Sequence, residues 1–442
     1  MEYRLFGRSG LKVSALGYGC MTFGDPSNGN VRTPATTPLP TPLPLYVVTS
    51  GYLVLLPAQM DEAAVEEMVG TLHRAGVNFF DHSCAPASSL RRPHRNPSSN
   101  PQGDRVTGAA AGREAYGGSN RGAPEVMFGN TVRKLGIKRS DLVVSSKIFN
   151  HYNNEGLGPN EIGLSRKHLR EGMEDILGRL EMDYVDVISA HRPDNLTPIE
   201  ETVRGFNWLI DNGHALVSHA VAPPPAPPLS SCPCCSLRVH WVSVNQLSMN
   251  HVKRACGTQY WGTSNWSAQQ LTEANEIAQK LDMVGPIAEQ PPYSMLNRDF
   301  VESEFMPIYD KYGLGIMCYS PLAGGVLTGK YSSQATEKAD ATSRFVQRGG
   351  PPADQVEKAD ALAPICAELD CEMAHLALAW ALANPNISTL IAGATKISQL
   401  ESNLKCFDVL PKLTPDVMAK IDEAVGTKPE GAAETNSLRS ML

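Results

Sequence analysis

Three polar residues stand at the ends of otherwise apolar segments, and their types suit the binding and transfer of a proton. Lys147 lies near the end of DLVVSSKIF, Asp81 ends VNFFD, and His191 ends YVDVISAH. Lysine is almost never fully buried without a partner, so we expect Lys147 to meet an acid, and Asp81 is the natural candidate. An amine, a carboxylate and an imidazole that meet at one place can orient a substrate and help to move a proton.

Each of these residues also has an ordinary structural interpretation. Lys147 would extend into solvent if its strand ended early, Asp81 would cap a turn or a helix, and a single histidine at a strand end is as often structural as catalytic. The decision depends on whether the surrounding elements bring the three side chains to the same place.

The apolar segments alternate with amphipathic helical patterns along most of the chain, and they are nearly continuous in their apolar character, as buried parallel strands should be. Predicted strands cover 15–19, 77–81, 141–149, 184–191, 260–264, 285–290, 314–322 and 388–395. Eight strand–helix units predict an α/β fold of the (β/α)8 TIM barrel type, whose catalytic groups lie at the carboxyl ends of the strands. The segment YRLFGRSGLKVSALG predicts a small N-terminal hairpin that caps the bottom of the barrel.

Helix boundaries support this division. The pattern over 61–76 ends in Gly76 as the residue after the C-cap, and the pattern over 165–182 begins at Ser165 as an N-cap. The pattern over 197–213 begins with Thr197 as cap and Pro198 in the first turn.

The bulk composition excludes several classes of protein. The 442 residues are 42% hydrophobic and 19% charged, which is typical of a globular protein, and the net charge of −7 argues against nucleic-acid partners. The N-terminus has no apolar signal region and no stretch is long enough to span a bilayer, so we expect a cytoplasmic protein without direct membrane insertion. Without a signal, the ten cysteines are expected to be reduced.

Three segments do not fit the alternating pattern. They lie at about 31–59, 84–113 and 216–259, they are rich in Pro, Ser or Ala, and they have neither a helical nor a strand period. We therefore expect a single barrel over 1–428 with three long irregular insertions, followed by a flexible tail at 429–442.

A set of motifs gives this chain a resemblance to a known family. They are YRLFGRSGLKVSALGYG, NFFD, YVDVISAHRPD, TPIEETVR, YWGTSNWSAQQ, YSPLAGGVLTGKY and DVLPKL. Together they resemble the aldo-keto reductases, in particular the branch of the voltage-gated potassium channel β subunits and their plant and bacterial relatives. The resemblance runs from residue 1 to about 428 and leaves out the three irregular segments.

The resemblance implies a catalytic tetrad of Asp, Tyr, Lys and His, and it places three members on Asp81, Lys147 and His191. The tyrosine should follow the aspartate five residues later, where this sequence has DHSCAPASS instead. Removing residues 84–113 gives D-H-S-E-A-Y-G, which restores the family spacing and assigns the catalytic tyrosine to Tyr116. The alternative is that Tyr116 is an ordinary loop tyrosine.

The same comparison suggests that the three segments are foreign to the fold. Joining DNGHA to YWGTSNW, or FGDPSNGN to MDEAAVEE, restores an ordinary passage between elements of this family. Our hypothesis is that the segments are retained introns in the predicted gene. Sequencing the transcript across codons 84–113 tests it, and finding those codons in the mature message would remove it.

The resemblance further implies NADP(H) as cofactor and a carbonyl compound as substrate. Tyr116 would donate the proton, and Lys147, held by Asp81, would lower its pKa from the ordinary value near 10. His191 would orient the carbonyl. The residues implied to bind the cofactor are Met21, Asp81, Ser264, Asn265, Gln290, Tyr319, Ser320, Pro321, Leu322, Ala323, Gly324, Lys330, Arg344, Gly393, Thr395, Lys396, Gln399 and Asn403. Cations near the adenosine 2′ position favour NADP over NAD.

Other interpretations remain open at this point. A regulatory subunit of a potassium channel would keep the same fold and NADPH and would bind a channel's cytoplasmic domain, and a homo-oligomer is compatible with either function. The insertions would also be compatible with a catalytically impaired homologue. Two apparent motifs are weaker: GGVLTGKY has Tyr331 where a phosphate loop needs serine or threonine to bind magnesium, and CPCC (232–235) lacks the spacing of a zinc site, so no metal is expected.

Overall fold

The computed structural model describes residues 1–23, 60–82, 122–149, 158–212, 258–332 and 350–430, together with the backbone of two short strands. These strands, β4 (Val48–Thr49) and β5 (Tyr52–Leu53), pair antiparallel inside the first predicted insertion, where no regular structure was expected. The rest of the three insertions lies outside the described residues, apart from residues 258 and 259. These two belong to the strand that was predicted to start at 260. The last twelve residues of the predicted tail also lie outside them.

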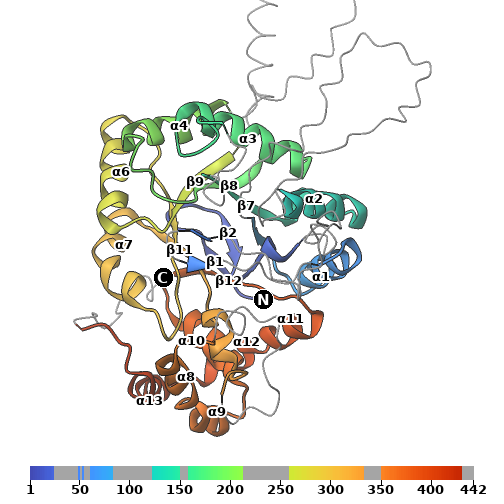
Figure 1. Ribbon diagram of the computed structural model, residues 1–442, viewed down its shortest axis with the longest axis vertical. Coiled ribbons are helices and arrows are strands. Elements are labelled where there is room, and N and C mark those ends of the chain that lie inside the picture. The colour runs from blue at the N-terminus through green and yellow to red at the C-terminus, as the bar shows by residue number, and fades with distance from the viewer. Residues whose placement is uncertain are drawn as a thin grey trace, which may run out of the picture.

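Eight parallel strands close into a barrel, which confirms the predicted fold (Figure 1). The barrel order is β10-β11-β12-β3-β6-β7-β8-β9. The strands are β3 (Leu16–Gly19), β6 (Phe79–Asp81), β7 (Val143–Ile148), β8 (Val185–Ala190), β9 (Thr258–Ser264), β10 (Ala288–Gln290), β11 (Gly315–Tyr319) and β12 (Ile387–Ala392). Every residue of β6, β7, β8, β10 and β12 is buried, which explains why these segments read as continuous apolar runs.

Helices surround the strands (Figure 1), and their buried apolar residues belong to the core cluster that covers the barrel. They are α1 (Glu62–Arg74), α2 (Ala123–Leu135), α3 (Arg166–Leu180), α4 (Ile199–Asn212), α6 (Ala268–Lys280), α7 (Met306–Tyr312), α8 (Ala353–Asp360), α9 (Ala363–Leu369), α10 (Met373–Ala383), α11 (Ile397–Leu404), α12 (Cys406–Val409) and α13 (Pro415–Val425). Shorter helical turns are η1 (Cys20–Thr22), η3 (Arg139–Asp141), η4 (Phe300–Glu304), η5 (Ala323–Thr328) and η7 (Leu410–Lys412).

Two of the predicted helix ends, at Ser165 and Gly76, agree with the structure. Ser165 accepts a hydrogen bond from the backbone N–H of His168 at the start of α3, and Gly76 follows the C-cap of α1 with φ 82°. The start of α4 differs from the prediction: the hydroxyl of Thr197 donates to Asp194 at 2.7 Å, and α4 begins two residues later, at Ile199. These local signals decide where each helix starts and stops, and so where each following strand enters the barrel.

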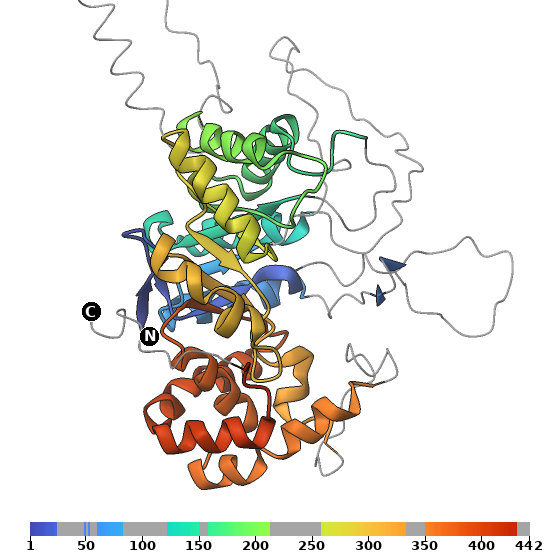
Figure 2. The same cartoon turned by 90° about the vertical axis from the view of Figure 1, so that its left-hand side faces the viewer.

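The N-terminal hairpin closes the bottom of the barrel, as predicted. It consists of β1 (Tyr3–Leu5) and β2 (Lys12–Ser14), paired antiparallel. Phe6 and Val13 are fully buried in a cluster with apolar residues from the amino ends of the barrel strands, including Phe79 and Val187. Figure 2 shows the dark blue hairpin at the left side of the barrel, near the N-terminus. The carboxyl ends of the strands therefore form the open face.

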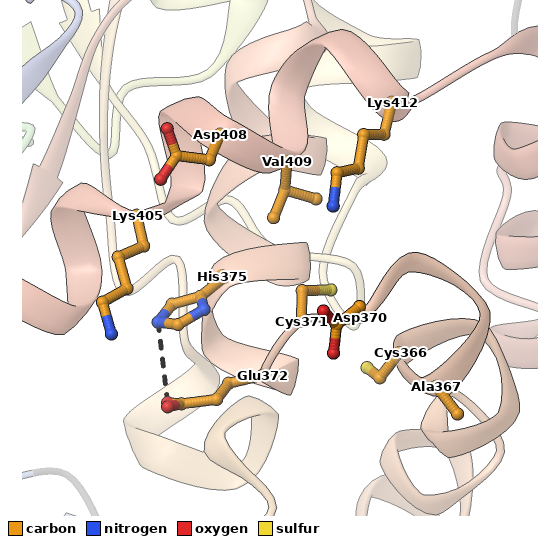
Figure 3. A pocket seen from close by; sticks show the side chains of 10 residues that line it. All are labelled: Cys366, Ala367, Asp370, Cys371, Glu372, His375, Lys405, Asp408, Val409 and Lys412. Atoms are coloured by element: carbon orange, nitrogen blue, oxygen red, sulfur yellow. Dashed lines mark ion pairs between the residues drawn. The ribbon is translucent and has the colours of Figure 1, made fainter.

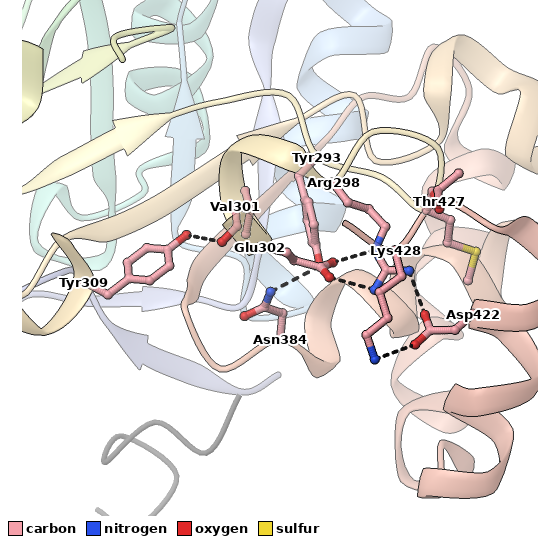
Figure 4. A network of polar contacts seen from close by, with 10 residues as sticks. Tyr293, Arg298, Val301, Glu302, Tyr309, Asn384, Asp422, Thr427 and Lys428 are labelled. Carbon is pink, nitrogen blue, oxygen red and sulfur yellow. Dashed lines mark hydrogen bonds and ion pairs between the residues drawn. The ribbon is translucent and has the colours of Figure 1, made fainter. Parts of the chain in front are cut away.

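A buried polar network ties the loop after β10 to the last helix (Figure 4). Arg298 donates to Glu302 at 2.7 and 2.9 Å and to Asp422 of α13 at 2.6 Å. Tyr293 donates to the same Glu302 at 2.8 Å and accepts from Asn384 at 3.2 Å. Each buried charge in this network has an opposite charge as partner, as burial of charge requires. Among the helices of the described ranges, none is long and apolar enough to cross a membrane.

Candidate active site

Lys147 and Asp81 form a buried ion pair at the carboxyl ends of two neighbouring strands. The Nζ atom of Lys147 donates to both carboxylate oxygens of Asp81, at 2.7 and 2.6 Å, and to the carbonyl of His82 at 2.9 Å. Lys147 is 1% exposed and Asp81 7% exposed. The side chain of Lys147 thus does not extend into solvent, and the acid that the sequence predicted for it is its partner.

His191 directly follows the next strand, β8, and lies beside the end of β7. Its backbone N–H donates to the carbonyl of Ile148 at 3.0 Å, and the residue is buried. In the parallel register Lys147 is opposite Ser189, two residues before His191. Because parallel strands of a barrel end at the same rim, three successive strands bring Asp81, Lys147 and His191 to one side of the open face. Tyr116 lies outside the described residues.

A second buried ion pair supports β7 from the helix side. Ser146, which points away from the barrel interior, donates to Glu125 of α2 at 2.7 Å. Glu125 is in turn paired with Arg179 of α3, and both charged side chains are buried. This connection fixes β7 against two helices at the residue next to Lys147, so that the amine is held on a rigid element.

Four of the predicted cofactor residues are joined by hydrogen bonds at the ends of β9, β10 and β11. The Tyr319 hydroxyl donates to Asn265 Oδ1 at 2.9 Å, and Asn265 Nδ2 donates to Ser264 Oγ at 2.8 Å. Ser264 Oγ donates to the carbonyl of Gln290 at 3.0 Å. The amide nitrogen of Gln290 is buried and has no hydrogen-bond partner in the described part of the chain. A buried donor of this kind is an available contact for a ligand.

The loop after β11 has an unusual backbone. Ser320 and Ala323 have φ values of 58° and 47°, and Gly324 and Gly325 have 66° and 98°. A Cβ added to Gly325 would lie 2.7 Å from Nζ of Lys330, so the amine rests directly against this glycine. Pro321 and Leu322 belong to the same turn. A turn in which a right-handed residue such as Leu322 precedes a left-handed one such as Ala323 can form a concave backbone surface that suits anions.

A third group of predicted cofactor residues follows β12. Gln399 Oε1 accepts from the backbone N–H groups of Thr395 and Lys396, at 2.9 and 3.3 Å, and so caps the start of α11. Gly393 lies in the same connection, and Asn403 is buried on α11 itself. Met21 lies in η1, which follows β3, the strand next to β12 in the barrel, and it is 45% exposed. Arg344 lies outside the described residues.

Sequence reasoning missed two buried titratable residues beside these groups. His82 is fully buried, its Nδ1 lies 3.1 Å from the carbonyl of Ser145, and burial lowers its pKa to about 4. Glu289 is fully buried between Thr263 and the backbone N–H of Trp266, 3.2 Å away, and burial raises its pKa to about 8. The signal for Glu289 was available, since it is a charged residue inside the apolar run GPIAEQ. His82 had none beyond its place next to Asp81.

The comparison with protein families decides the identity of this barrel. The sequence model of the Aldo/keto reductase family matches residues 50–220 and 238–425. The chain belongs to the aldo-keto reductase family. Members of this family are generally NAD(P)H-dependent oxidoreductases, and the match covers the elements that carry Asp81, Lys147 and His191.

Individual relatives of this aldo-keto reductase carry names from one branch. The chain is 38% identical to the "Probable voltage-gated potassium channel subunit beta" of Oryza sativa subsp. japonica, over 97% of this chain and 98% of that protein. It is 37% identical to the protein of the same name from Arabidopsis thaliana, with the same coverage. It is 35% identical to the "Putative voltage-gated potassium channel subunit beta" of Schizosaccharomyces pombe, over 70% of this chain and 78% of that protein. The predicted likeness to the channel β subunit branch is therefore confirmed.

Proposed function

We propose that this aldo-keto reductase reduces aldehyde or ketone carbonyls to alcohols with NADPH. The observation that carries the proposal is the buried Lys147–Asp81 pair at the carboxyl ends of the barrel strands, because active sites of this fold lie at that face. A buried amine whose charge is held by one carboxylate is suited to tune a neighbouring acid, whereas a surface lysine is not.

The proposed roles of the side chains follow from their chemistry. The cofactor supplies the hydride when bound. Tyr116 donates the proton to the carbonyl oxygen, and the Lys147 ammonium favours the phenolate that remains after this transfer. Asp81 holds the ammonium in place, and the imidazole of His191 hydrogen-bonds to the carbonyl and orients it.

The residues present fit a nicotinamide dinucleotide. The unpartnered amide nitrogen of Gln290, next to Ser264 and Asn265, suits a carboxamide, which needs both donors and acceptors. The ring of Tyr319 would stack on the nicotinamide. The concave turn at 320–325, with Lys330 against it, suits a pyrophosphate.

The adenosine end of the cofactor is assigned to the connection after β12. Gly393, Thr395, Lys396, Gln399 and Asn403 lie there, and the Lys396 ammonium at the start of α11 provides the positive charge that a 2′-phosphate requires. This charge, with Arg344, favours NADP(H) over NAD(H).

The first experiment is to measure NADPH binding from the quenching of tryptophan fluorescence, and then NADPH oxidation with a panel of aldehydes. The wild-type protein is expected to bind NADPH and to turn over part of the panel, while Tyr116→Phe binds NADPH and loses turnover. Turnover that persists in Tyr116→Phe would refute the assignment of the acid. Absence of NADPH binding in the wild-type protein would refute the cofactor assignment.

A second candidate function is regulation of a potassium channel, and the names of the three relatives favour it. In this role the protein binds a channel's cytoplasmic domain and uses NADPH as a ligand. Retention of the protein on an immobilised channel cytoplasmic domain, with no retention on the support alone, would favour this regulatory role. Turnover of aldehydes would favour the reductase role. A catalytically impaired homologue would bind NADPH but would not turn over any aldehyde. The wild-type protein and Tyr116→Phe would then behave alike.

A further inference from the structure

Two cysteines face each other across the end of α9. The N–H of Cys371 donates to the carbonyl of Cys366 at 3.0 Å, the N–H of Asp370 donates to Ala367 at 3.3 Å, and Asp370 has a φ of 50°. These are the two hydrogen bonds and the left-handed residue of a Schellman motif, in which the first and last of these side chains meet. Covalent bond lengths then keep the two Cα atoms within about 7 Å, close to the limit of about 6.8 Å for a disulfide.

The two cysteines open onto one pocket. Both line a hollow of about 410 Å³, and the Schellman motif brings their side chains together. Figure 3 shows the side chains of Cys366 and Cys371 among the residues that line this hollow, with Asp370 beside them in the view. Cys366 is 9% exposed and Cys371 is half-buried, so Cys371 is the more accessible of the pair. In the described part of the chain no cluster of three or more His, Cys, Asp or Glu could hold a metal ion, which argues against a metal site here.

We propose that Cys366 and Cys371 form a thiol–disulfide exchange site that takes up a small zwitterionic peptide disulfide from this pocket. Cys371 Sγ attacks one sulfur of the small disulfide, so that a mixed disulfide forms and one small thiol leaves with the proton. Cys366 Sγ then attacks Cys371 Sγ, an internal disulfide forms, and the second small thiol leaves with the second proton. The protein loses two hydrogens and the small disulfide gains them.

The charges around the pocket match a ligand that carries both signs. Lys405 and Lys412 provide ammonium groups for carboxylates, and Asp370 and Asp408 provide carboxylates for an ammonium group (Figure 3). A glutathione molecule carries two carboxylates and one ammonium group, so glutathione disulfide is the appropriate probe. Lys412 also acts directly on the first thiol, since its charge favours the thiolate of Cys371.

The protonation of the thiols predicts how fast exchange proceeds. Burial raises the pKa of both Cys366 and Cys371, so that both are thiols rather than thiolates at neutral pH. Because the thiolate is the attacking species, exchange is expected to be slow at neutral pH and to speed up as the pH rises. Thiols that are not stabilised as thiolates also gain more from forming a disulfide, so the internal disulfide should persist once formed.

Peptide mapping by mass spectrometry tests the proposal. Trypsin releases both cysteines in a single peptide that ends at Lys396, and cleavage after Glu368 separates them unless a disulfide joins them. After incubation of the native protein with glutathione disulfide, the two fragments are expected to stay joined until a reductant is added. Cys366→Ser is expected to stop at a mixed disulfide on Cys371, and Cys371→Ser to leave Cys366 unmodified. Cys406→Ala, in the neighbouring α12, keeps the joined fragments and is the matched control.

The contradicting result is also defined by this experiment. If both thiols stay reduced in the native wild-type protein while the same reagent modifies them in guanidinium-unfolded protein, the exchange site is refuted. A mixed disulfide on Cys366 rather than Cys371 refutes the order of attack. The wild-type measurement depends neither on the folding of the variants nor on the proposed reductase activity, so failure of either proposal is recognised separately.

Discussion

At the scale of single residues, burial determines the character of the site. Lys147 and Asp81 are almost completely removed from water, and the amine has three acceptors: two carboxylate oxygens and the carbonyl of His82. A charge in such a place is tolerated only while its partner is present. The pair therefore contributes to stability mainly through the large cost of breaking it, and it keeps the ammonium in one position.

Lys147→Met tests this dependence directly. The variant leaves the Asp81 carboxylate buried without a counter-charge, which is expected to lower the free energy of unfolding by about 3–5 kcal/mol. The double variant Lys147→Met with Asp81→Asn should recover much of that loss. Denaturant unfolding of wild type, both single variants and the double variant measures the coupling. Additive effects of the two substitutions would contradict it.

A surface pair provides the control for this cycle. Lys134 and Glu66 also form an ion pair, but the Lys134 side chain is 69% exposed. Lys134→Met is expected to change the stability far less than Lys147→Met, because exposed pairs are screened by water and salt. Equal losses in the two lysine variants would mean that burial of the Lys147 pair is not what makes it costly to break.

At the scale of elements, the loop after β11 is the most specialised segment of the site. Ser320, Ala323, Gly324 and Gly325 have positive φ values in this loop, and Lys330 lies against Gly325. Glycine is required at position 325 for two reasons: the φ of 98° disfavours any side chain, and a Cβ would displace the amine of Lys330.

Gly325→Ala is expected to weaken NADPH binding by about tenfold or more, equivalent to about 1.4 kcal/mol. Gly329→Ala is the matched control. It has the same kind of backbone, with φ 75°, but its added Cβ would meet only Met373, at 3.7 Å. Titration of tryptophan fluorescence with NADPH compares the two variants. Equal losses of affinity in both would show that backbone strain, rather than displacement of Lys330, is responsible.

The elements were also what the sequence predicted best. All eight strands are present because buried parallel strands are continuous apolar runs, and Ser165 and Gly76 marked helix ends through local capping chemistry. The start of β9 was placed two residues too late, since Thr258 and Gln259 are polar and adjoin an irregular segment. His82 and Glu289 were missed because their unusual protonation arises from tertiary burial, which no local pattern reports. The pairing of Asp81 with Lys147 could be predicted because the barrel places strand ends together.

At the scale of the whole molecule, two buried titratable groups link stability to pH in opposite directions. Folding raises the pKa of Glu289 from 4.5 to about 8, so between these values the folded protein holds a proton that the unfolded chain has released. This contribution makes the free energy of unfolding fall as the pH rises through that window. Folding lowers the pKa of His82 from 6.5 to about 4, so its contribution is lost as the pH falls below 6.5.

Glu289→Gln is expected to remove the alkaline loss. Glutamine can still accept from the N–H of Trp266 and bond to Thr263, but it does not titrate. The stability difference between this variant and wild type should therefore increase in favour of the variant, by several kcal/mol, between pH 4.5 and pH 8. Guanidinium unfolding at a series of pH values measures it. Parallel curves for the two proteins would show that Glu289 does not carry this dependence.

His82→Asn provides the complementary measurement. It should reduce the loss of stability between pH 6.5 and about pH 4 and leave the alkaline side unchanged. If His82→Asn instead altered the alkaline side, the separate assignment of the two effects would be wrong.

The most direct test of the central claim is the rate of hydride transfer in Lys147→Met loaded with NADPH. We propose that a buried amine at the rim of the barrel makes a neighbouring phenol an effective acid, so removing the amine should slow transfer to a reactive aldehyde by about 10²–10⁴-fold. NADPH affinity should stay within a few fold of wild type, since the proposed cofactor contacts other than Asp81 lie away from β7, mostly at the ends of β9, β10, β11 and β12. A Lys147→Met protein that binds NADPH and reduces the aldehyde at nearly the wild-type rate would show that the buried amine does not activate the acid.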